Sequence, residues 1–265
     1  MNILSNQPPE SDSQALWKHF SDTYFTLRLG LSLLALAMPI TLYLYGKLIH
    51  GLPLQPSMSA YFWAADVEHC ATFPMRTIFV GFLLAIGTGL YLYKGLTGLE
   101  NTLLNLAAIC AALVAIFPES LDAANPGNDA RLAALLEACP AVKRWATEVP
   151  QTYIHAGAAI VLFILLAAVA WFCASKSLAY LPDHHNPTRF ERTYAVLAIA
   201  MIAFPAIGLG IAALLDLEPY RVFIIETLGV MTFGIYWLVK SRELALSHLE
   251  SDPGLAIEQK SRRLD

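Results

Sequence analysis

Six apolar blocks divide the chain, and each is close to the length that crosses a lipid bilayer. The blocks are residues 27–45, 77–93, 99–118, 153–175, 194–215 and 220–239. A helix needs about 20 mostly apolar residues to cross the hydrocarbon core of a membrane. The third block is the weakest, because Glu100, Asn101 and Asn105 lie in its first turns. The pattern predicts an all-α, polytopic membrane protein with six transmembrane helices.

The composition supports this fold class. Hydrophobic residues fill 57% of the 265 positions and charged residues only 14%, whereas soluble domains have roughly 45–50% and about 25%. Buried helices of a large soluble protein are also apolar on every side, but so few charged residues could not surround six such helices with a soluble surface. The net charge of −4 and the lack of a basic patch in the sequence exclude a nucleic-acid-binding protein. Membrane lipids are the expected partners.

Lysine and arginine are distributed unevenly between the two sets of connections. Eleven of the 17 residues of these types lie in the flanks that include both chain ends, and six lie in the other set. Because cytoplasmic flanks carry the excess of positive charge, both termini are predicted to be cytoplasmic. The first residues lack the basic and apolar regions of a cleaved secretion signal, so none is expected.

Three parts are expected along the chain: a cytoplasmic N-terminal segment, a transmembrane domain and a cytoplasmic tail. They comprise residues 1–25, 26–240 and 241–265, with outer loops at 46–76, 119–152 and 216–219. Residues 12–22 are predicted to form a short amphipathic helix on the membrane surface. The tail is expected to extend the last helix and then fray at residues 251–254, "SDPG". In the long outer loop, leucine spacing predicts a helix over residues 130–139 that covers either lipid headgroups or the mouth of the bundle.

Glu226 is the most informative polar residue, because it lies inside the sixth apolar block. It follows the outer end of that block by six residues, which places it about 9 Å deep at ~1.5 Å per residue. An ionisable group at this depth costs roughly 3 kcal/mol unless it is paired or hydrated. His155, about one turn into the fourth block, and Arg76, at the start of the second, lie at the same end. A functional site and a structural Arg76–Glu226 ion pair both fit these positions. The pair is the predicted contact, because a buried carboxylate needs a partner.

Histidines and cysteines of the outer segments suggest further chemistry. His50, His69 and His155 share the outer face, and three protein ligands with a water molecule form the usual catalytic zinc site. Solvated histidines are the alternative, because no compact metal-binding motif joins the three, and no cofactor other than zinc is suggested. Cys70 and Cys139 also lie in outer segments, where disulfides persist. A Cys70–Cys139 bridge and two unpaired thiols both remain open.

Short motifs are spread over most of the chain from residue 57 to residue 240. They are "SMSAYF" at 57–62, "MRTIFVG" at 75–81, "LYKG" at 92–95, "LLNLAA" at 103–108, "AIFP" at 115–118, "IH" at 154–155, and Glu226 followed by "FGIYWLVK" at 233–240. In combination they resemble a bacterial family of uncharacterised multi-span membrane proteins. The resemblance implies a bacterial inner-membrane location, and it implies no activity.

The same resemblance highlights four polar positions as the candidate catalytic residues. They are Ser59, Arg76, His155 and Glu226, and the last three coincide with residues that their depth in the apolar blocks already singles out. The chain departs from the family pattern at Thr77, where the family has an acidic residue. Asp66 or Glu68 would have to replace that carboxylate if the chemistry needs one.

Three functions remain open, and the sequence does not decide whether the protein is an enzyme. The preferred one is a membrane-embedded hydrolase that acts on a lipid or amphiphile in an outward-facing polar pocket. It is supported by a distant similarity to the alkaline ceramidase and progestin-receptor-like superfamily, which places a serine, an aspartate and three histidines in a helical bundle, although the HxxxH pair of that superfamily is missing here. A non-enzymatic sensor or partner subunit would use Arg76 and Glu226 for helix packing. A proton-coupled transporter would exchange protons between His155 and Glu226.

Overall fold

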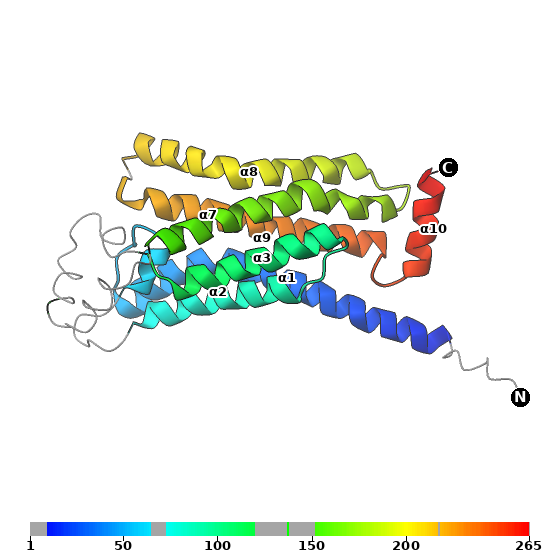
Figure 1. Cartoon of the computed structure of the whole chain (residues 1–265), viewed down its shortest axis with the longest axis horizontal. Coiled ribbons are helices and arrows are strands. Elements are labelled where there is room, and N and C mark those ends of the chain that lie inside the picture. Colours follow the sequence, from blue (N-terminus) through cyan, green and yellow to red (C-terminus); the bar gives the residue numbers. More distant parts are fainter. Residues whose placement is uncertain (1–9, 65–72, 120–136, 138–151, 217, 265) are drawn as a thin grey trace, which may run out of the picture.

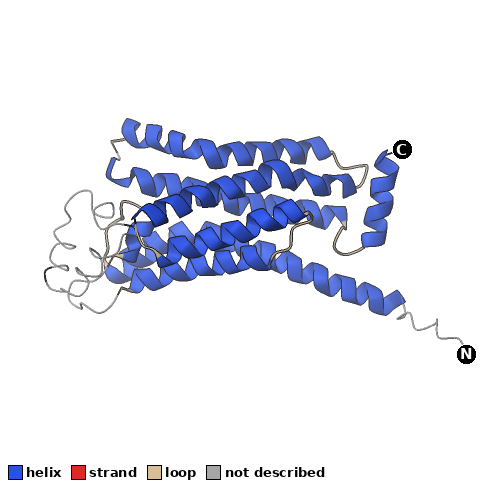
Figure 2. Cartoon of the chain, viewed as in Figure 1, coloured by secondary structure: helices blue, strands red, loops and turns tan. Residues whose placement is uncertain are grey.

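The computed structural model describes residues 10–64, 73–119, 137, 152–216 and 218–264. Its regular elements in these ranges are all helical (Figure 2), which confirms the predicted all-α class for this part of the chain. The long helices are α1 (Glu10–His50), α2 (Pro74–Leu92), α3 (Gly98–Ile116), α7 (Thr152–Ala168), α8 (Pro187–Leu214), α9 (Arg221–Ser247) and α10 (Pro253–Leu264). The short helical segments are η1 (Ser59–Phe62), η2 (Val169–Cys173), η3 (Ala174–Tyr180) and η4 (Glu218–Tyr220).

Five of the described helical stretches are long and apolar enough to cross a membrane. They are Asp12–His50, Pro74–Leu92, Gly98–Ile116, Tyr153–Tyr180 and Arg221–Ser247. These helices indicate an integral membrane protein. The predicted span at residues 194–215 falls almost wholly within α8, a helix of 28 residues. That α8 is a sixth span, and that both termini are cytoplasmic, stay predictions.

The six helices of the bundle pack side by side as a closed ring (Figure 1). Its order is α1, α2, α3, α7, α8 and α9, and α9 packs against α1 again. Large aromatic side chains help to fill the interior, among them Tyr61, Tyr194, Tyr236 and Trp237, none more than 2% exposed. Burying these rings gives the bundle much of its apolar core.

Helices α1 and α9 close the ring through an unusually near approach at Gly234. A β-carbon at this position would lie 2.8 Å from Cγ of Leu36 and 3.2 Å from the backbone oxygen of Ser32. The Ser32 hydroxyl donates a hydrogen bond of 2.8 Å to the Gly234 carbonyl. Small residues are common at such contacts in membranes, because they let two backbones pack closely and share polar bonds.

Both ends of the described chain differ from the sequence-based expectation. Helix α1 runs without a break from Glu10 to His50, so residues 12–22 are not a separate helix but the first turns of α1, and they extend beyond the bundle (Figure 1). The prediction that the tail frays at residues 251–254 is wrong. A tight turn leads there into α10, because the Asp252 carboxylate accepts a hydrogen bond of 3.0 Å from the Leu255 amide and caps the new helix.

The tail also binds the bundle directly. The guanidinium of Arg28, only 1% exposed, donates two hydrogen bonds to the Glu250 carboxylate, of 2.5 and 2.7 Å. Such two-pronged pairs fix both partners in one geometry. The ion pair therefore holds the connection between α9 and α10 against α1.

Helix α7 continues into two non-α segments, the π-helical η2 and the 3-10-helical η3. A wide turn followed by tight turns shifts the hydrogen-bond register, and this frees backbone carbonyls for other donors. The carbonyl of Ala174 accepts a hydrogen bond of 3.0 Å from the Lys240 ammonium. The irregular stretch thus builds polar contacts inside an apolar bundle.

Candidate functional site

The connection between α1 and α2 enters the end of the bundle opposite to α10 (Figure 1). We call its residues 56–64 the plug. Every residue from Ser57 to Ala64 is buried, and four of them form η1. An ordinary surface loop is exposed, so this burial sets the plug apart from a simple connection.

Two hydrogen bonds donated by backbone amides attach the plug to α9. The amide of Met58 donates to Oε2 of Glu226 at 2.6 Å, and the amide of Phe223 donates to the Pro56 carbonyl at 2.9 Å. Glu226 thus uses its carboxylate to satisfy a backbone donor that is buried at the start of η1. A carboxylate is the strongest acceptor available for such a group.

Further bonds attach the plug to the residues that follow α3. The Ser57 hydroxyl donates to the Glu119 carboxylate, and the indole nitrogen of Trp63 donates to the Glu119 backbone oxygen at 2.8 Å. The Ser57 hydroxyl also accepts a bond of 2.8 Å from the Ala60 amide. Side chain and backbone of one glutamate therefore hold both ends of η1.

Ser59 lies at the centre of the predicted site and contacts two of its other members. Its hydroxyl is 2.9 Å from Nε2 of His155 and donates to Oε1 of Glu226 over 3.3 Å. Nδ1 of His155 lies 2.7 Å from the Phe117 carbonyl. Three of the four predicted site residues, Ser59, His155 and Glu226, are thus brought together, and we call these three residues the outer polar cluster.

The Phe117 carbonyl determines which nitrogen of His155 carries a proton. A carbonyl oxygen can only accept, so Nδ1 must be protonated. Nε2 then accepts from Ser59 when the imidazole is neutral and donates to Ser59 when it is a cation. The Ser59 hydroxyl can complete either arrangement, because it donates one hydrogen bond and accepts others.

Arg76 lies elsewhere than predicted. Its Cζ atom is 4.3 Å from the ring centre of Phe62 and 3.9 Å from that of Phe73, and its Nε donates to the Phe62 carbonyl at 3.1 Å. Among the described contacts no ion pair joins Arg76 to Glu226, so the predicted pair is wrong. The guanidinium is held by aromatic faces and a carbonyl, while Glu226 obtains its hydrogen bonds from the plug.

The predicted metal ligands receive no support from the residues that can be compared. Both ring nitrogens of His155 already make hydrogen bonds, so metal binding would cost one of them. His50 packs against Tyr45 with ring centres 5.3 Å apart. No group of three metal-ligating side chains occurs in the described ranges. His69, Cys70 and Cys139 lie outside those ranges, so the zinc site and the disulfide stay predictions.

A second buried group of polar side chains lies toward the other end of α9, and the sequence analysis missed it. We call Lys240, Glu243, Ser177 and Tyr194 the inner polar cluster. The Lys240 ammonium donates to the Glu243 carboxylate at 2.9 Å and to the Ser177 hydroxyl at 2.5 Å. The Ser177 and Tyr194 hydroxyls both donate to the same carboxylate, at 2.8 and 3.2 Å. Lys240 is 3% exposed and Glu243 is fully buried.

A cavity of about 390 Å³ adjoins the inner polar cluster. Lys240 and Ser177 line it, together with Glu100 of α3. Glu100 is only 2% exposed, and its carboxylate accepts a hydrogen bond of 2.9 Å from the Leu96 amide. The cavity therefore has charged walls of both signs, and it lies at the end of the bundle, where Trp17 and Glu250 also line it.

Glu119 is expected to make stability depend on pH. Burial raises the pKa of its carboxyl above the ordinary value of about 4.5, and the Ser57 hydrogen bond opposes this rise. The folded protein therefore binds this proton more tightly than the unfolded chain. The resulting stability is fully present below pH 4.5 and is lost as the pH rises through the higher folded value. Glu119→Gln should flatten this part of the profile, measured as the denaturation midpoint between pH 4 and 7.

The glutamine keeps an oxygen that can accept from Ser57, so the plug should remain in place in this variant. Wild-type and variant curves are compared at each pH, because the titrating groups that do not interact with Glu119 then cancel. Parallel curves over the whole range would contradict the prediction.

The chain matches no protein-family profile, no curated protein sequence and no solved structure. The family resemblance and the distant superfamily similarity therefore stay expectations. A function has to be inferred from the plug and the two polar clusters.

Proposed function

We propose that the protein is a proton-coupled membrane transporter. The outer polar cluster exchanges a proton, and the plug is the gate that responds to it. The observation that carries the proposal is the position of Ser59, whose hydroxyl joins His155 to Glu226. Ionisable residues inside membrane proteins commonly mark proton pathways.

The proton moves by two short steps through the serine. In the first arrangement a protonated Glu226 donates to the Ser59 hydroxyl, which donates to Nε2 of His155. In the second, the hydroxyl proton has passed to His155, and the Glu226 proton has passed to the serine oxygen. One net proton has moved from Glu226 to His155, Ser59 is unchanged, and the total charge is conserved. No heavy atom needs to leave its place.

The gate follows from the contacts that Glu226 and His155 make with the plug. Glu226 accepts a hydrogen bond from the Met58 amide. This bond weakens when the carboxylate is neutralised, because hydrogen bonds to charged groups are stronger than those to neutral ones. His155 holds Ser59 within η1. A change in where the proton resides therefore changes how firmly the plug is attached.

The inner polar cluster supplies the second polar region that transport requires. It lies on α9, as Glu226 does, but four to five turns farther along the helix at 3.6 residues per turn. Its cavity of about 390 Å³ has room for a small solute. Between the two clusters, Asn105 of α3 and Tyr236 of α9 have buried polar atoms without a partner in the described chain. These atoms can form hydrogen bonds with water molecules that pass a proton between the two clusters.

A serine hydrolase is the second candidate, and one specific observation favours it. A serine bonded to a histidine whose other nitrogen is fixed by a third group is the arrangement of an activated nucleophile. Ser59, His155 and the Phe117 carbonyl have this arrangement. Transport is preferred because acyl transfer also needs free backbone donors beside the serine for the oxyanion. Here the neighbouring Met58 amide already donates to Glu226.

A pH jump applied to reconstituted protein tests the transporter proposal. Proteoliposomes are adsorbed on a solid-supported membrane, and a step to lower pH is expected to displace charge transiently in the wild type. Glu226→Gln should abolish this signal because it removes the proton-binding group, and Ser59→Ala should abolish transfer to His155. Glu191→Gln, at an exposed position of α8, is the matched control and should behave as the wild type.

Incubation with a fluorophosphonate separates the two candidates. This probe bonds covalently to activated serines, so a hydrolase would carry an adduct on Ser59 that mass spectrometry detects. An adduct there, or equal charge displacement in the wild type and Glu226→Gln, would overturn the transporter proposal.

A further inference from the structure

Two adjoining cavities lie at the start of α8, at the end of the bundle that also carries α10 (Figure 1). Their volumes are about 490 and 510 Å³. Asn186, Arg189 and Thr193 line both of them. Because they share these residues, the two cavities lie next to each other along α8, and we call them together the α8 groove. It belongs to neither polar cluster.

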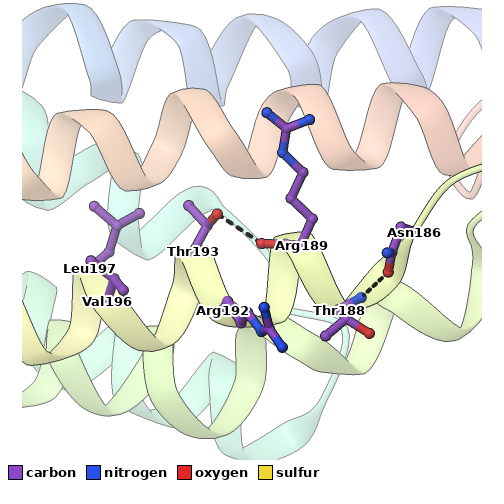
Figure 3. A pocket seen from close by; sticks show the side chains of 7 residues that line it. All are labelled: Asn186, Thr188, Arg189, Arg192, Thr193, Val196 and Leu197. Atoms are coloured by element: carbon purple, nitrogen blue, oxygen red, sulfur yellow. Dashed lines mark hydrogen bonds between the residues drawn. The ribbon is translucent and has the colours of Figure 1, made fainter.

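The α8 groove is strongly basic. Arg189 and Arg192 of α8 and Arg242 of α9 line it, together with His184 and His185, and none of its lining residues is acidic. All three arginines are exposed, and in the described chain none of them takes part in an ion pair. Figure 3 shows Arg189 reaching toward the neighbouring helix, while Arg192 is directed to another side of α8. Arg189 lines both cavities, whereas Arg192 lines only the one of about 490 Å³ and Arg242 only the one of about 510 Å³.

The groove becomes apolar farther along the same helix. Val196 and Leu197 line its far part, about two turns beyond Arg189 (Figure 3), and Val196 is 63% exposed. Residues three, four and seven positions apart lie on one helix face, so charge and hydrocarbon follow one another along a single surface. A surface that is basic at one end and apolar at the other fits a molecule with an anionic head and an apolar chain.

We propose that the α8 groove binds an anionic phospholipid. The guanidinium groups of Arg189 and Arg192, which line the same cavity as Val196 and Leu197, bind the phosphate, since the planar arginine fork can donate two parallel hydrogen bonds to its oxygens. The acyl chain lies along α8 past Thr193 against the exposed face of Val196. A soluble phosphate compound would satisfy the basic part only and would leave the apolar part unused.

Lipid titration followed by native mass spectrometry tests this proposal. The full-length protein is released from detergent micelles that contain either phosphatidylglycerol or phosphatidylcholine. Phosphatidylglycerol should bind more tightly. Removing two charges in Arg189→Gln/Arg192→Gln should weaken its binding about 25-fold, because each basic residue near an anionic lipid contributes about a factor of five. Lys18→Gln/Lys176→Gln removes the same charge from exposed positions outside the groove and should have little effect.

Competition with inorganic phosphate identifies the source of the phosphate group. Millimolar phosphate should not displace the lipid, because it lacks the apolar chain. Displacement by phosphate would overturn the lipid assignment, and so would equal losses in the groove variant and its control. These outcomes are independent of the proton experiment, since neither variant alters Ser59, His155 or Glu226.

Discussion

Replacing Lys240 by methionine is expected to lower the free energy of unfolding by about 3–5 kcal/mol, the usual cost of removing one partner of a buried ion pair. The ammonium is the only cation bonded to the fully buried Glu243 carboxylate among the described residues. Without it, two hydroxyls would be left to hold a carboxylate in an apolar interior. The loss can be measured by unfolding the protein with increasing SDS in mixed micelles.

Two further variants make this result specific to the pair. Lys176→Met changes an exposed lysine on η3 and should shift stability by no more than about 0.5 kcal/mol. Lys240→Met/Glu243→Leu should recover most of the loss, because replacing both charges by apolar side chains is often close to neutral. A Lys240→Met protein as stable as the Lys176→Met control would show that the pair contributes nothing.

Replacing Glu226 by alanine is expected to loosen the plug while leaving the bundle folded. The change removes the acceptor of the Met58 amide and of the Ser59 hydroxyl. A hydrogen bond to a charged group contributes about 1.5–3 kcal/mol, and about 1.4 kcal/mol corresponds to a factor of ten in an opening equilibrium. Amide hydrogen exchange in residues 57–64 should therefore speed up by at least about tenfold.

Exchange is followed by mass spectrometry on peptides from the plug and from the closing contact of α1 with α9. The peptide around Gly234 should keep its wild-type rate, which shows that the ring is intact. Glu191→Ala is the matched control on an exposed face. Unchanged exchange of the plug in Glu226→Ala would mean that Glu226 does not hold it.

The outer polar cluster could be predicted because its members stand out from their surroundings. Glu226 and His155 interrupt apolar blocks, and a charged or imidazole group there needs a polar neighbour. The partner of Glu226 could not be predicted in the same way. Arg76 is held by Phe62 and Phe73, and the contact of two aromatic rings with one guanidinium depends on how the plug folds. Glu226 instead bonds to a backbone amide, and such a donor leaves no mark in the sequence.

The inner polar cluster was missed because its residues look ordinary where they stand. Lys240 and Glu243 follow the last apolar block, a place where charged residues usually face water or headgroups. Helix α9 continues to Ser247 and buries both residues against Ser177 and Tyr194. Ser177 can approach Lys240 because η2 and η3 change the course of the fourth span. Nothing in the apolar pattern of residues 153–175 indicates that change.

The closure of the ring by α1 and α9 has a consequence for biosynthesis. These are the first and the last helices of the ring to leave the ribosome, so α1 must wait in the bilayer until the rest of the bundle has been made. During this interval the Ser32 hydroxyl and the Arg28 guanidinium have neither the Gly234 carbonyl nor the Glu250 carboxylate to bind. This face of α1 therefore stays without its final partners until the chain has been synthesised as far as Glu250.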